Sequence, residues 1–379
     1  MSYQVLARKW RPKNFSEVAG QGHVLRTLIN ALDNQRLHHA YLFTGTRGVG
    51  KTTLARILAK CLNCETDITS TPCGMCNACK EIKEGRFIDL IEVDAASRTK
   101  VEDTRELLEN VQYSPASARF KVYLIDEVHM LSNHSFNALL KTLEEPPPHT
   151  KFLFATTDPQ KLPVTILSRC LQFNLKPLSS KIIADFIMDI LKEESVIFDE
   201  EGVWDIAGAA DGSMRDALTL LDQGISYCKG QINSDAIREM LGVPDRLQSF
   251  LILQALAEKS APNVIKVISQ LSEGSPDFKG LLDNLLSLFH RLAIAQILPG
   301  SVENNLGDRE QILNLCESFL TEDLQLYYQM GCKARAEIET APDAKTSFEM
   351  LMLRMITFSP ASESQKSINA GNNQKKNKS

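Results

Sequence analysis

The sequence predicts an α/β fold in which a parallel sheet covered by helices is followed by all-helical parts. Up to about residue 175, β-type runs alternate with segments of helical periodicity, the pattern of strands joined by crossover helices. A glycine-rich octapeptide at residues 45–52 lies between an apolar run and a helix-forming run. From Ser179 to Phe358, every periodic segment has helical spacing.

The expected strands are short apolar runs at 41–44, 88–93, 122–126, 152–156 and 171–175. Between them, apolar residues recur at helical spacing in two segments: Val24, Leu25, Leu28, Ile29 and Leu32, then Phe136, Leu139, Leu140 and Leu143. In the C-terminal part, the clearest helical stripe consists of Leu281, Leu282, Leu285, Leu286, Phe289 and Leu292.

The octapeptide GTRGVGKT matches the phosphate-loop pattern G-x-x-x-x-G-K-[ST]. In such a loop backbone N–H groups wrap the phosphates, Lys51 would reach the β and γ oxygens, and Thr52 would offer its hydroxyl to Mg²⁺. The alternative is a glycine turn without a ligand, but the strand before and the helix after are the context that the pattern requires. The residues expected to bind a nucleoside triphosphate are Gly45, Thr46, Arg47, Gly48, Val49, Gly50, Lys51, Thr52 and Thr53.

Two carboxylates end the apolar run at residues 122–125. Asp126 would hold the magnesium ion, directly or through its waters, and Glu127 would polarise the attacking water. The alternative is a strand that ends in two solvated acids. With the phosphate loop in the same predicted sheet, the pair indicates nucleotide hydrolysis.

Three further residues are candidates for the same site. Thr157 follows the expected strand at 152–156, where it could orient the water or contact the γ-phosphate; a turn that begins at Thr157-Asp158 is the alternative. Arg169 lies at the rim of the nucleotide domain, and Arg215 lies in the first turn of a helix whose capping box pairs Ser213 with Asp216. A cation in the first turn of a helix, such as Arg215, opposes the helix dipole and is better placed facing an anion. For each arginine, a surface ion pair is the alternative.

Four of the nine cysteines, Cys64, Cys73, Cys76 and Cys79, fall in a loop-like insertion after the phosphate-loop helix, at about residues 61–82. Four thiolates without histidine or carboxylate suit a closed tetrahedral Zn²⁺ with a structural role. An iron–sulfur cluster is the rival, but the Cys-Pro ending of that pattern is absent because Lys80 follows Cys79. The other five are expected to be buried small apolar residues: Cys61, Cys170, Cys228, Cys316 and Cys332.

A chain of 379 residues is long enough for two or three domains, each with its own hydrophobic core. We expect a nucleotide-binding domain at 1–178, a small helical lid at 179–242, a longer helical domain at 243–358 and a disordered tail at 359–379, which is rich in Ser, Asn, Lys and Gln. The formal charge is −5, so any contact with nucleic acid must come from a local patch. The first residues have no apolar signal segment and no later stretch is long and apolar enough to span a membrane, which favours a cytoplasmic location.

The motifs together resemble an AAA+ ATPase of the clamp-loader type, and within that class the bacterial gamma/tau family. The resemblance rests on the phosphate loop, the acidic strand end, Ser-Arg-Cys at 168–170 and Gly-Ser-Met-Arg-Asp at 212–216. Further matching segments are YQVLARKWRP at 3–12, HHAYLF at 38–43, DAASRTKVED at 94–103 and ALLKTLEEPP at 138–147. The resemblance is dense through about residue 230 and weaker in the last helical region, where QLYYQ at 325–329 matches.

The resemblance implies roles that spacing alone does not give. Family members form a ring-like hetero-pentamer through a C-terminal helical collar, and they use ATP to open a sliding clamp and place it on primed DNA. Arg169 matches the arginine finger that reaches a neighbour's γ-phosphate, Arg215 the sensor of the helical lid, and Thr157 the sensor on the sheet. The residues that fall where the family builds its adenine-side pocket are Ala7, Arg11 and Val18. The family also carries the cysteine insertion.

Contacts with DNA and with the clamp are expected near the rim of the sheet. Arg98, Lys100 and Lys141 could meet phosphates inside the ring, which requires charge and no base reading; solvated surface charges are the alternative. Candidates for the clamp contact are Leu107, Leu108 and Tyr113, for which core packing is the alternative.

The leading interpretation is therefore an ATP-driven motor subunit that loads a sliding clamp during DNA replication. Another AAA+ DNA-processing motor is the first alternative, but it would need a DNA-binding domain at the C-terminus, where this sequence has helices and a tail. An ATP-binding scaffold without turnover is the second, and Lys51, Thr52, Asp126 and Glu127 argue against it. Nothing resembles a polymerase active site, so polymerase activity would belong to the holoenzyme.

Overall fold

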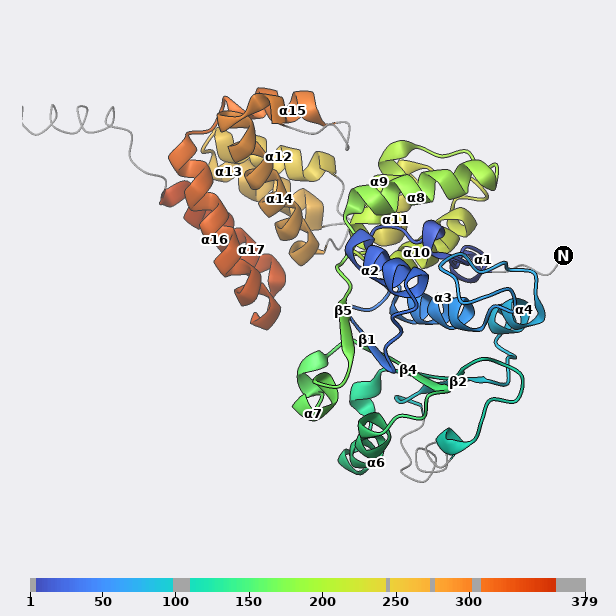
Figure 1. The fold of residues 1–379 in the computed structure, drawn as a ribbon. Coiled ribbons are helices and arrows are strands. Elements are labelled where there is room, and N and C mark those ends of the chain that lie inside the picture. The colour runs from blue at the N-terminus through green and yellow to red at the C-terminus, as the bar shows by residue number, and fades with distance from the viewer. Residues whose placement is uncertain (1–4, 98–109, 243–245, 273–276, 302–307, 359–379) are drawn as a thin grey trace, which may run out of the picture. The chain divides into compact units, whose positions relative to one another are not determined.

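The computed structural model describes residues 5–97, 110–242, 246–272, 277–301 and 308–358 (Figure 1). The chain forms two compact units. The first consists of the residues up to Phe198 together with Val203–Gln231, and the second of Asp199–Gly202 together with the residues from Ile232 onward. The expected tail at 359–379 lies outside the described residues.

The first unit is built on a five-stranded parallel sheet with the strand order β2-β3-β4-β1-β5. All five expected strands are confirmed, and their bounds are Ala40–Thr44 (β1), Leu90–Asp94 (β2), Lys121–Asp126 (β3), Thr150–Thr156 (β4) and Leu171–Asn174 (β5). In the register of β1 and β4, Thr44 lies opposite Thr156. The carboxyl ends of β1, β3 and β4 therefore meet at one edge of the sheet, where ligands of parallel sheets bind.

Helices cover both faces of this sheet (Figure 1). On one face, Leu28 of α2 (Gly22–Asp33) and Leu58 of α3 (Lys51–Asn63) share a buried cluster with Tyr41 and Phe43. On the other, residues of α6 (Asn133–Glu144) and α7 (Val164–Leu167) pack against the alternate side chains of the strands. Every residue of β1 and β4 is buried, because each strand has a neighbour on both sides and helices above and below.

The lid follows the sheet in three helices, which are α8 (Ser180–Glu193), α9 (Glu200–Ala209) and α10 (Met214–Tyr227). Ser213, at the predicted capping spacing from Asp216, is the N-cap of α10: its Oγ accepts a hydrogen bond of 3.2 Å from the backbone N–H of Asp216. The remaining elements of the first unit are the short helix α1 (Leu6–Lys9) and the 3₁₀ turns at Phe15–Glu17, Asn110–Gln112, Val128–Met130 and Pro159–Lys161.

The second unit is helical throughout the residues that can be described. Its helices are α11 (Ser234–Leu241), α12 (Arg246–Ala257), α13 (Ala261–Ser272), α14 (Phe278–Ile297), α15 (Arg309–Cys316), α16 (Thr321–Thr340) and α17 (Ala344–Thr357), with a 3₁₀ turn at Pro299–Ser301. The predicted leucine-rich stripe of α14 is buried, and Phe289 in that stripe packs with Tyr327 and Phe348 in one core. The predicted fold class, a parallel nucleotide-binding sheet followed by a helical lid and a second helical domain, is confirmed.

The insertion with the cysteines differs from its expected loop-like form. Residues Asn77–Glu84 form helix α4, which begins at Cys76 and ends at Gly85 in the left-handed conformation. Ala78 and Ile82 of this helix are buried in the same cluster as α3. The sequence did not indicate this helix, because two apolar residues four positions apart in an eight-residue segment are too few to establish a helical period.

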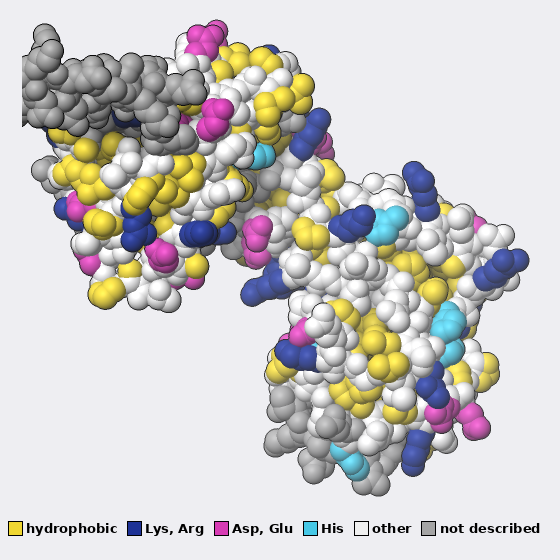
Figure 2. Space-filling model, turned by 90° about the vertical axis from the view of Figure 1, so that its left-hand side faces the viewer, with side chains coloured by type: hydrophobic (Ala, Val, Ile, Leu, Met, Phe, Trp, Pro, Cys, Tyr) yellow, Lys and Arg dark blue, Asp and Glu magenta, His cyan; other side chains and the backbone are white. Residues whose placement is uncertain are grey.

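Basic side chains on the face seen in Figure 2 stand apart from one another, among polar and apolar groups. That view has no continuous basic band, in keeping with the net charge of −5. Of the helices that the structure describes, none combines the length and the apolar character needed to cross a membrane.

Candidate nucleotide site

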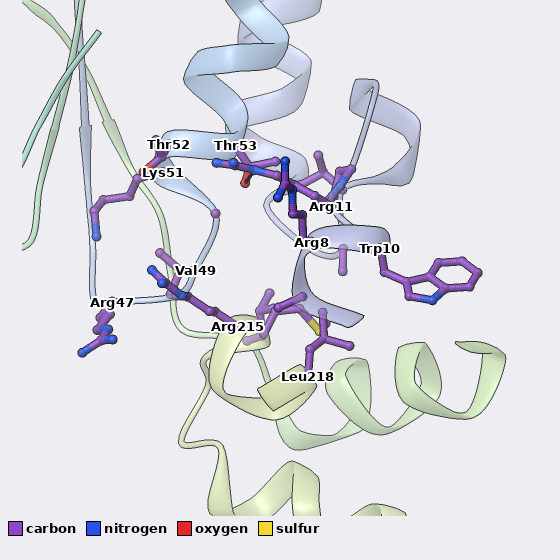
Figure 3. A pocket seen from close by; sticks show the side chains of 18 of the residues that line it. Arg8, Trp10, Arg11, Arg47, Val49, Lys51, Thr52, Thr53, Arg215 and Leu218 are labelled. Carbon is purple, nitrogen blue, oxygen red and sulfur yellow. Dashed lines mark hydrogen bonds between the residues drawn. The ribbon is translucent and has the colours of Figure 1, made fainter. Parts of the chain in front are cut away.

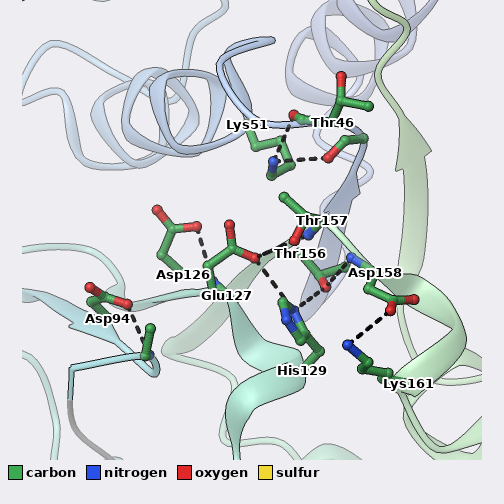
Figure 4. Close-up of polar contacts among 12 residues, drawn as sticks. Thr46, Lys51, Asp94, Asp126, Glu127, His129, Thr156, Thr157, Asp158 and Lys161 are labelled. Carbon is green, nitrogen blue, oxygen red and sulfur yellow. Dashed lines mark hydrogen bonds and ion pairs between the residues drawn. The ribbon is translucent and has the colours of Figure 1, made fainter. Parts of the chain in front are cut away.

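The phosphate loop joins β1 to α3 and is shaped by three glycines with positive φ, Gly45 at 141°, Gly48 at 77° and Gly50 at 103°. Lys51 opens α3, and its Nζ donates hydrogen bonds of 2.9 Å to the carbonyl oxygens of Gly45 and Thr46 (Figure 4). Burial lowers the pKa of Lys51, while the charges of Glu127 and Asp126 act in the opposite direction. The ammonium group is thus held by neutral carbonyls in a loop whose geometry favours an anion.

The end of β3 lies directly beside this loop. Thr52 Oγ1 donates a hydrogen bond of 2.6 Å to Asp126 Oδ2, so the hydroxyl and the carboxylate are already side by side. Both are oxygen ligands of the kind that Mg²⁺ prefers, and Mg²⁺ is usually held by one or two protein oxygens together with water and substrate phosphate. These two residues fit a magnesium ion that arrives with the nucleotide.

Glu127 follows in a left-handed conformation with φ 46°, which turns its carboxylate toward the end of β4. Its Oε2 accepts hydrogen bonds from Thr157 N at 3.1 Å and Thr157 Oγ1 at 2.9 Å. His129 Nδ1 lies 3.4 Å from the same oxygen and 2.9 Å from Thr156 Oγ1 (Figure 4). Thr157 therefore contacts the carboxylate expected to polarise water. The position of His129 beside them could not be predicted from the sequence, because a histidine after an acidic strand end belongs to no known motif of a nucleotide site.

A cavity of about 410 Å³ opens over the phosphate loop. It has the size of pockets that hold small molecules. Its walls bring together residues from distant parts of the chain: the loop and α3, the N-terminal segment, the end of β3, and α8 and α10 of the lid (Figure 3). Of the predicted site residues, those that line it are Ala7, Arg11, Val18, Arg47, Gly48, Val49, Gly50, Lys51, Thr52, Thr53, Asp126, Glu127 and Arg215.

The wall opposite the loop contains residues that the sequence analysis missed. Trp10, Leu178, Phe186, Met214 and Leu218 line the cavity. They supply the apolar surface that a nucleobase requires. Isolated apolar residues from four segments share no sequence pattern, and only the folded chain places them together.

Arg11 is the most confined cation of this wall. Its Nε donates a hydrogen bond of 3.2 Å to Thr53 Oγ1 on α3 (Figure 3). Desolvation, aided by the nearby charge of Arg56, lowers the pKa of Arg11 to about 10, so the side chain stays protonated at neutral pH. Arg11 thus presents a fixed positive charge beside the first turn of α3.

The lid touches the phosphate loop at Gly48. A Cβ atom at this position would lie 1.8 Å from Ser213 Oγ and 2.9 Å from Ser213 Cβ. The residue that caps α10 therefore rests directly on the loop, and Arg215, two residues further on, lines the cavity.

Replacing Gly48 by alanine should weaken ATP binding at least tenfold, because the new methyl group forces Ser213 away and turns Arg215 out of the cavity. Equilibrium titration with a fluorescent ATP analogue measures this. Gly85→Ala is the matched control, since Gly85 has nearly the same φ, 75°, but no atom within 4 Å of its added Cβ. If the affinity of Gly48→Ala is no lower than that of Gly85→Ala, this role of the lid contact is contradicted.

The N-terminal segment is tied to the lid by hydrogen bonds. The backbone N–H of Leu6 donates to Asp222 Oδ2 of α10 at 2.8 Å. Lys9 Nζ and Trp10 Nε1 donate to the two carboxylate oxygens of Glu194, just after α8, at 2.7 and 3.0 Å. The wall that carries Ala7 and Arg11 is thereby attached to the lid.

Arg169 does not line the cavity. It follows α7, where its Nη2 donates to Glu144 Oε1 on α6 at 2.8 Å and its Nη1 to Thr165 O at 2.8 Å. About a third of its side chain is exposed. Within this chain Arg169 is a surface residue paired with an acid, the alternative considered from the sequence.

The four insertion cysteines converge, with their Sγ atoms all within 4.8 Å of one another. Backbone N–H groups of Cys73, Cys76 and Cys79 donate to the sulfurs of Cys64, Cys73 and Cys76, respectively, each at 3.4 Å. Such bonds stabilise thiolates, and the four-sulfur set fits a tetrahedral Zn²⁺.

The remaining sequence predictions fall outside the site. Cys61 and Cys316 are buried as expected, Cys170 and Cys228 are half-buried, and the prediction for Cys332 is wrong, since it is exposed on α16. Lys141 and Tyr113 are exposed. Arg98, Lys100, Leu107 and Leu108 lie outside the described residues.

Three family models match successive parts of the chain. "DNA polymerase III, delta subunit" matches residues 20–179, "DNA polymerase III clamp loader subunit, ATPase lid domain" residues 182–230, and "DNA polymerase III subunits gamma and tau domain III" residues 232–369. Among solved structures, the chain is similar to the Thermotoga maritima RuvB Holliday junction branch migration motor, with 23% identity and a TM-score of 0.47 over 66% of this chain and 80% of that one.

Curated relatives match almost the whole chain. It is 55% identical to DNA polymerase III subunit tau of Escherichia coli over 95% of this chain and 56% of that protein, so it spans little more than half of that relative's length. It is 45% identical to DNA polymerase III subunit gamma of Buchnera aphidicola subsp. Schizaphis graminum, over 94% of this chain and 99% of that protein. This identity over nearly the full length of a gamma subunit, with all three family models in their order, shows that the chain belongs to the gamma/tau family of DNA polymerase III subunits.

Proposed function

We propose that the protein is an ATP-hydrolysing motor subunit of a DNA polymerase III clamp loader, which opens the sliding clamp and loads it onto primed DNA. The observation that carries the proposal is the convergence of the phosphate loop, Asp126, Glu127 and the lid residue Arg215 on one cavity. A cavity closed by a mobile lid can couple the state of the nucleotide to the position of the helices that follow.

In this proposal Lys51 and the loop N–H groups hold the phosphates, while Thr52 and Asp126 hold the magnesium ion. Glu127 accepts the proton of the attacking water, and Thr157 orients that carboxylate and senses the γ-phosphate. Arg215 contacts the phosphates from the lid. The adenine lies against the wall formed by Ala7, Arg11 and Val18.

Arg169 acts as a finger in the site of a neighbouring subunit. Its absence from the lining of the cavity in its own chain supports this role. A partly exposed guanidinium group can exchange Glu144 for a phosphate at low cost, because surface ion pairs contribute little to stability. The ring is a hetero-pentamer held through the C-terminal helical domain, residues 243–358, with 1–178 as the nucleotide domain and 179–242 as the lid. Zn²⁺ on the four cysteines stabilises the insertion.

The proposed DNA contacts are Lys141, on α6 of the described structure, and Arg98 and Lys100 outside it. These residues would meet backbone phosphates, so DNA binding should weaken as salt is raised. Tyr113, 68% exposed, is a candidate for the clamp contact.

The test is the ATPase rate per subunit against protein concentration, alone and with the partner subunits, the clamp and primed DNA. The proposal requires low activity of the isolated chain and a rise on assembly and on addition of DNA, because Arg169 completes a site in trans. A rate that is independent of concentration, partners and DNA would contradict it. The proposed alternatives give other results: a scaffold has no turnover in any mixture, and a different DNA motor responds to DNA without the clamp.

A further inference from the structure

A second cavity in the first unit lies beside α3 and has a volume of about 640 Å³. Its walls come from α1 and the loop after it, from α3 and from α4 of the cysteine insertion. It shares Arg8, Arg11, Pro12 and Thr53 with the nucleotide cavity but otherwise has its own lining. The insertion therefore closes a space beside the phosphate-loop helix.

The lining of this second cavity is strongly cationic. It contains seven lysine and arginine residues from three elements, against a single acid, Glu84, which forms an ion pair with Arg86. The cations are Arg8, Lys9, Arg11, Lys13, Arg56, Lys60 and Lys83. On the face of the molecule in Figure 2, by contrast, basic side chains stand singly.

Two of these cations form ion pairs. Lys9 pairs with Glu194 at 2.5 Å and Arg56 pairs with Glu92. Among the residues that the structure describes, no acid forms an ion pair with the other five, Arg8, Arg11, Lys13, Lys60 and Lys83. The acids Glu92 and Glu17 act electrostatically on Arg11 and Lys60, but the cations of the lining outnumber them, so an anion that entered the cavity would be attracted.

Lys60 is the deepest of the cations, with only 6% of its surface exposed. The structure gives its Nζ one hydrogen bond, to Lys13 O at 2.8 Å, although an ammonium group has three donors. Desolvation lowers the pKa of Lys60. On the same helix, the buried Arg56 Nε has no hydrogen-bond partner. Buried donors without partners are costly, and a ligand that accepts hydrogen bonds would satisfy them.

We propose that this second cavity binds a small anion that carries two or more phosphate groups. Phosphate oxygens match both the lysines and the guanidinium groups of the lining, and several phosphates are needed to offset five unpaired cations. The lining has no aromatic side chain on which a nucleobase could stack, so the phosphates themselves are the recognised part. A nucleic-acid backbone could touch the exposed Lys13 and Lys83 at the rim but would not reach the buried Lys60.

The experiment is an isothermal titration of the full chain with inorganic tripolyphosphate, in buffer without magnesium. It uses the Lys51→Ala background, because the intact phosphate loop would also bind the probe; the outcome is thereby independent of clamp loading. We expect one bound tripolyphosphate per chain and weaker binding of orthophosphate. Replacing Lys13 and Lys83 together by glutamine should weaken the affinity at least about tenfold, since each forms a charge-assisted contact. Lys80→Gln, an exposed lysine of α4 outside the lining, is the matched control.

Three results would overturn the proposal. The first is no binding, or equal weakening by the Lys80 control. The second is displacement of tripolyphosphate by a short single-stranded oligonucleotide at a concentration below that of tripolyphosphate itself. This result would assign these lysines to the binding of a nucleic-acid backbone. The third concerns Lys60, whose charge also acts on Cys79 of the cysteine cluster. If Lys60→Met lowers the zinc content of the protein and leaves the tripolyphosphate affinity unchanged, Lys60 serves the cysteines and not an anion.

Discussion

Replacing Arg169 by alanine should leave ATP binding by the subunit nearly intact and lower turnover in the assembled complex by about 10³–10⁵-fold, the range for arginine fingers. The physical reason is that Arg169 does not line the cavity of its own chain and instead pairs with Glu144 at 2.8 Å. Its loss removes transition-state charge stabilisation from a neighbour's site only. Single-turnover hydrolysis in the complex, with ATP affinity measured on the free subunit, separates the two effects.

Two companion variants sharpen this prediction. Glu144→Gln frees the guanidinium group from its partner within the chain, and turnover should be unchanged or higher. Lys161→Ala removes another rim cation, which is paired with the exposed Asp158, and should have no effect. A loss of ATP affinity in isolated Arg169→Ala subunits would mean that this arginine serves its own site, contrary to the finger assignment.

Glu127→Gln should lower hydrolysis by about 10²–10⁴-fold, the usual contribution of a general base, while ATP still binds. Glutamine has the same shape, and its amide oxygen can accept the bonds that Thr157 now donates to Glu127 Oε2, but it cannot take a proton from water. Rapid-quench measurement of the chemical step and filter binding of ATP give the two quantities.

The control for this variant is Asp158→Asn, which changes a carboxylate at the same edge of the sheet but outside the cavity. Its turnover should equal that of the unmodified protein. Thr157→Val tests whether the Thr157 hydroxyl positions the Glu127 carboxylate, because it removes the hydroxyl donor and keeps the hydrogen bond from the backbone N–H. Unchanged hydrolysis by Glu127→Gln would exclude this residue as the base.

The sheet could be predicted in detail because buried parallel strands are continuous apolar runs, and β1 and β4 are buried at every residue. The motif residues at strand ends were also accessible to sequence reasoning, since parallel strands deliver their carboxyl ends to one edge. This is why Thr52 and Asp126, 74 residues apart, could be expected to meet. Helix α4 could not be predicted, because its eight residues are too few to show a helical period.

The apolar wall of the nucleotide cavity could not be predicted from the sequence for another reason. Trp10, Phe186 and Leu218 come from separate helices and segments, and each reads as an ordinary core residue along the chain. Their common position depends on how α1 and the lid pack on the sheet, and tertiary contacts alone determine that. The cationic second cavity is similar, since Lys60 and Lys83 become neighbours only when the insertion folds back on α3.

The hydrogen bonds from Leu6, Lys9 and Trp10 to the lid have a consequence for the kinetics of nucleotide exchange. Because these bonds join both walls of the base-binding side into one piece, opening cannot occur by the lid alone swinging off a stationary wall. Release of the product then requires the joined piece to separate from α3 and the phosphate loop, both at the hydrogen bond from Arg11 to Thr53 and where Ser213 rests on Gly48. We therefore expect the lifetime of bound nucleotide to depend on these few contacts, and a change of subunit geometry that separates them would trigger nucleotide exchange.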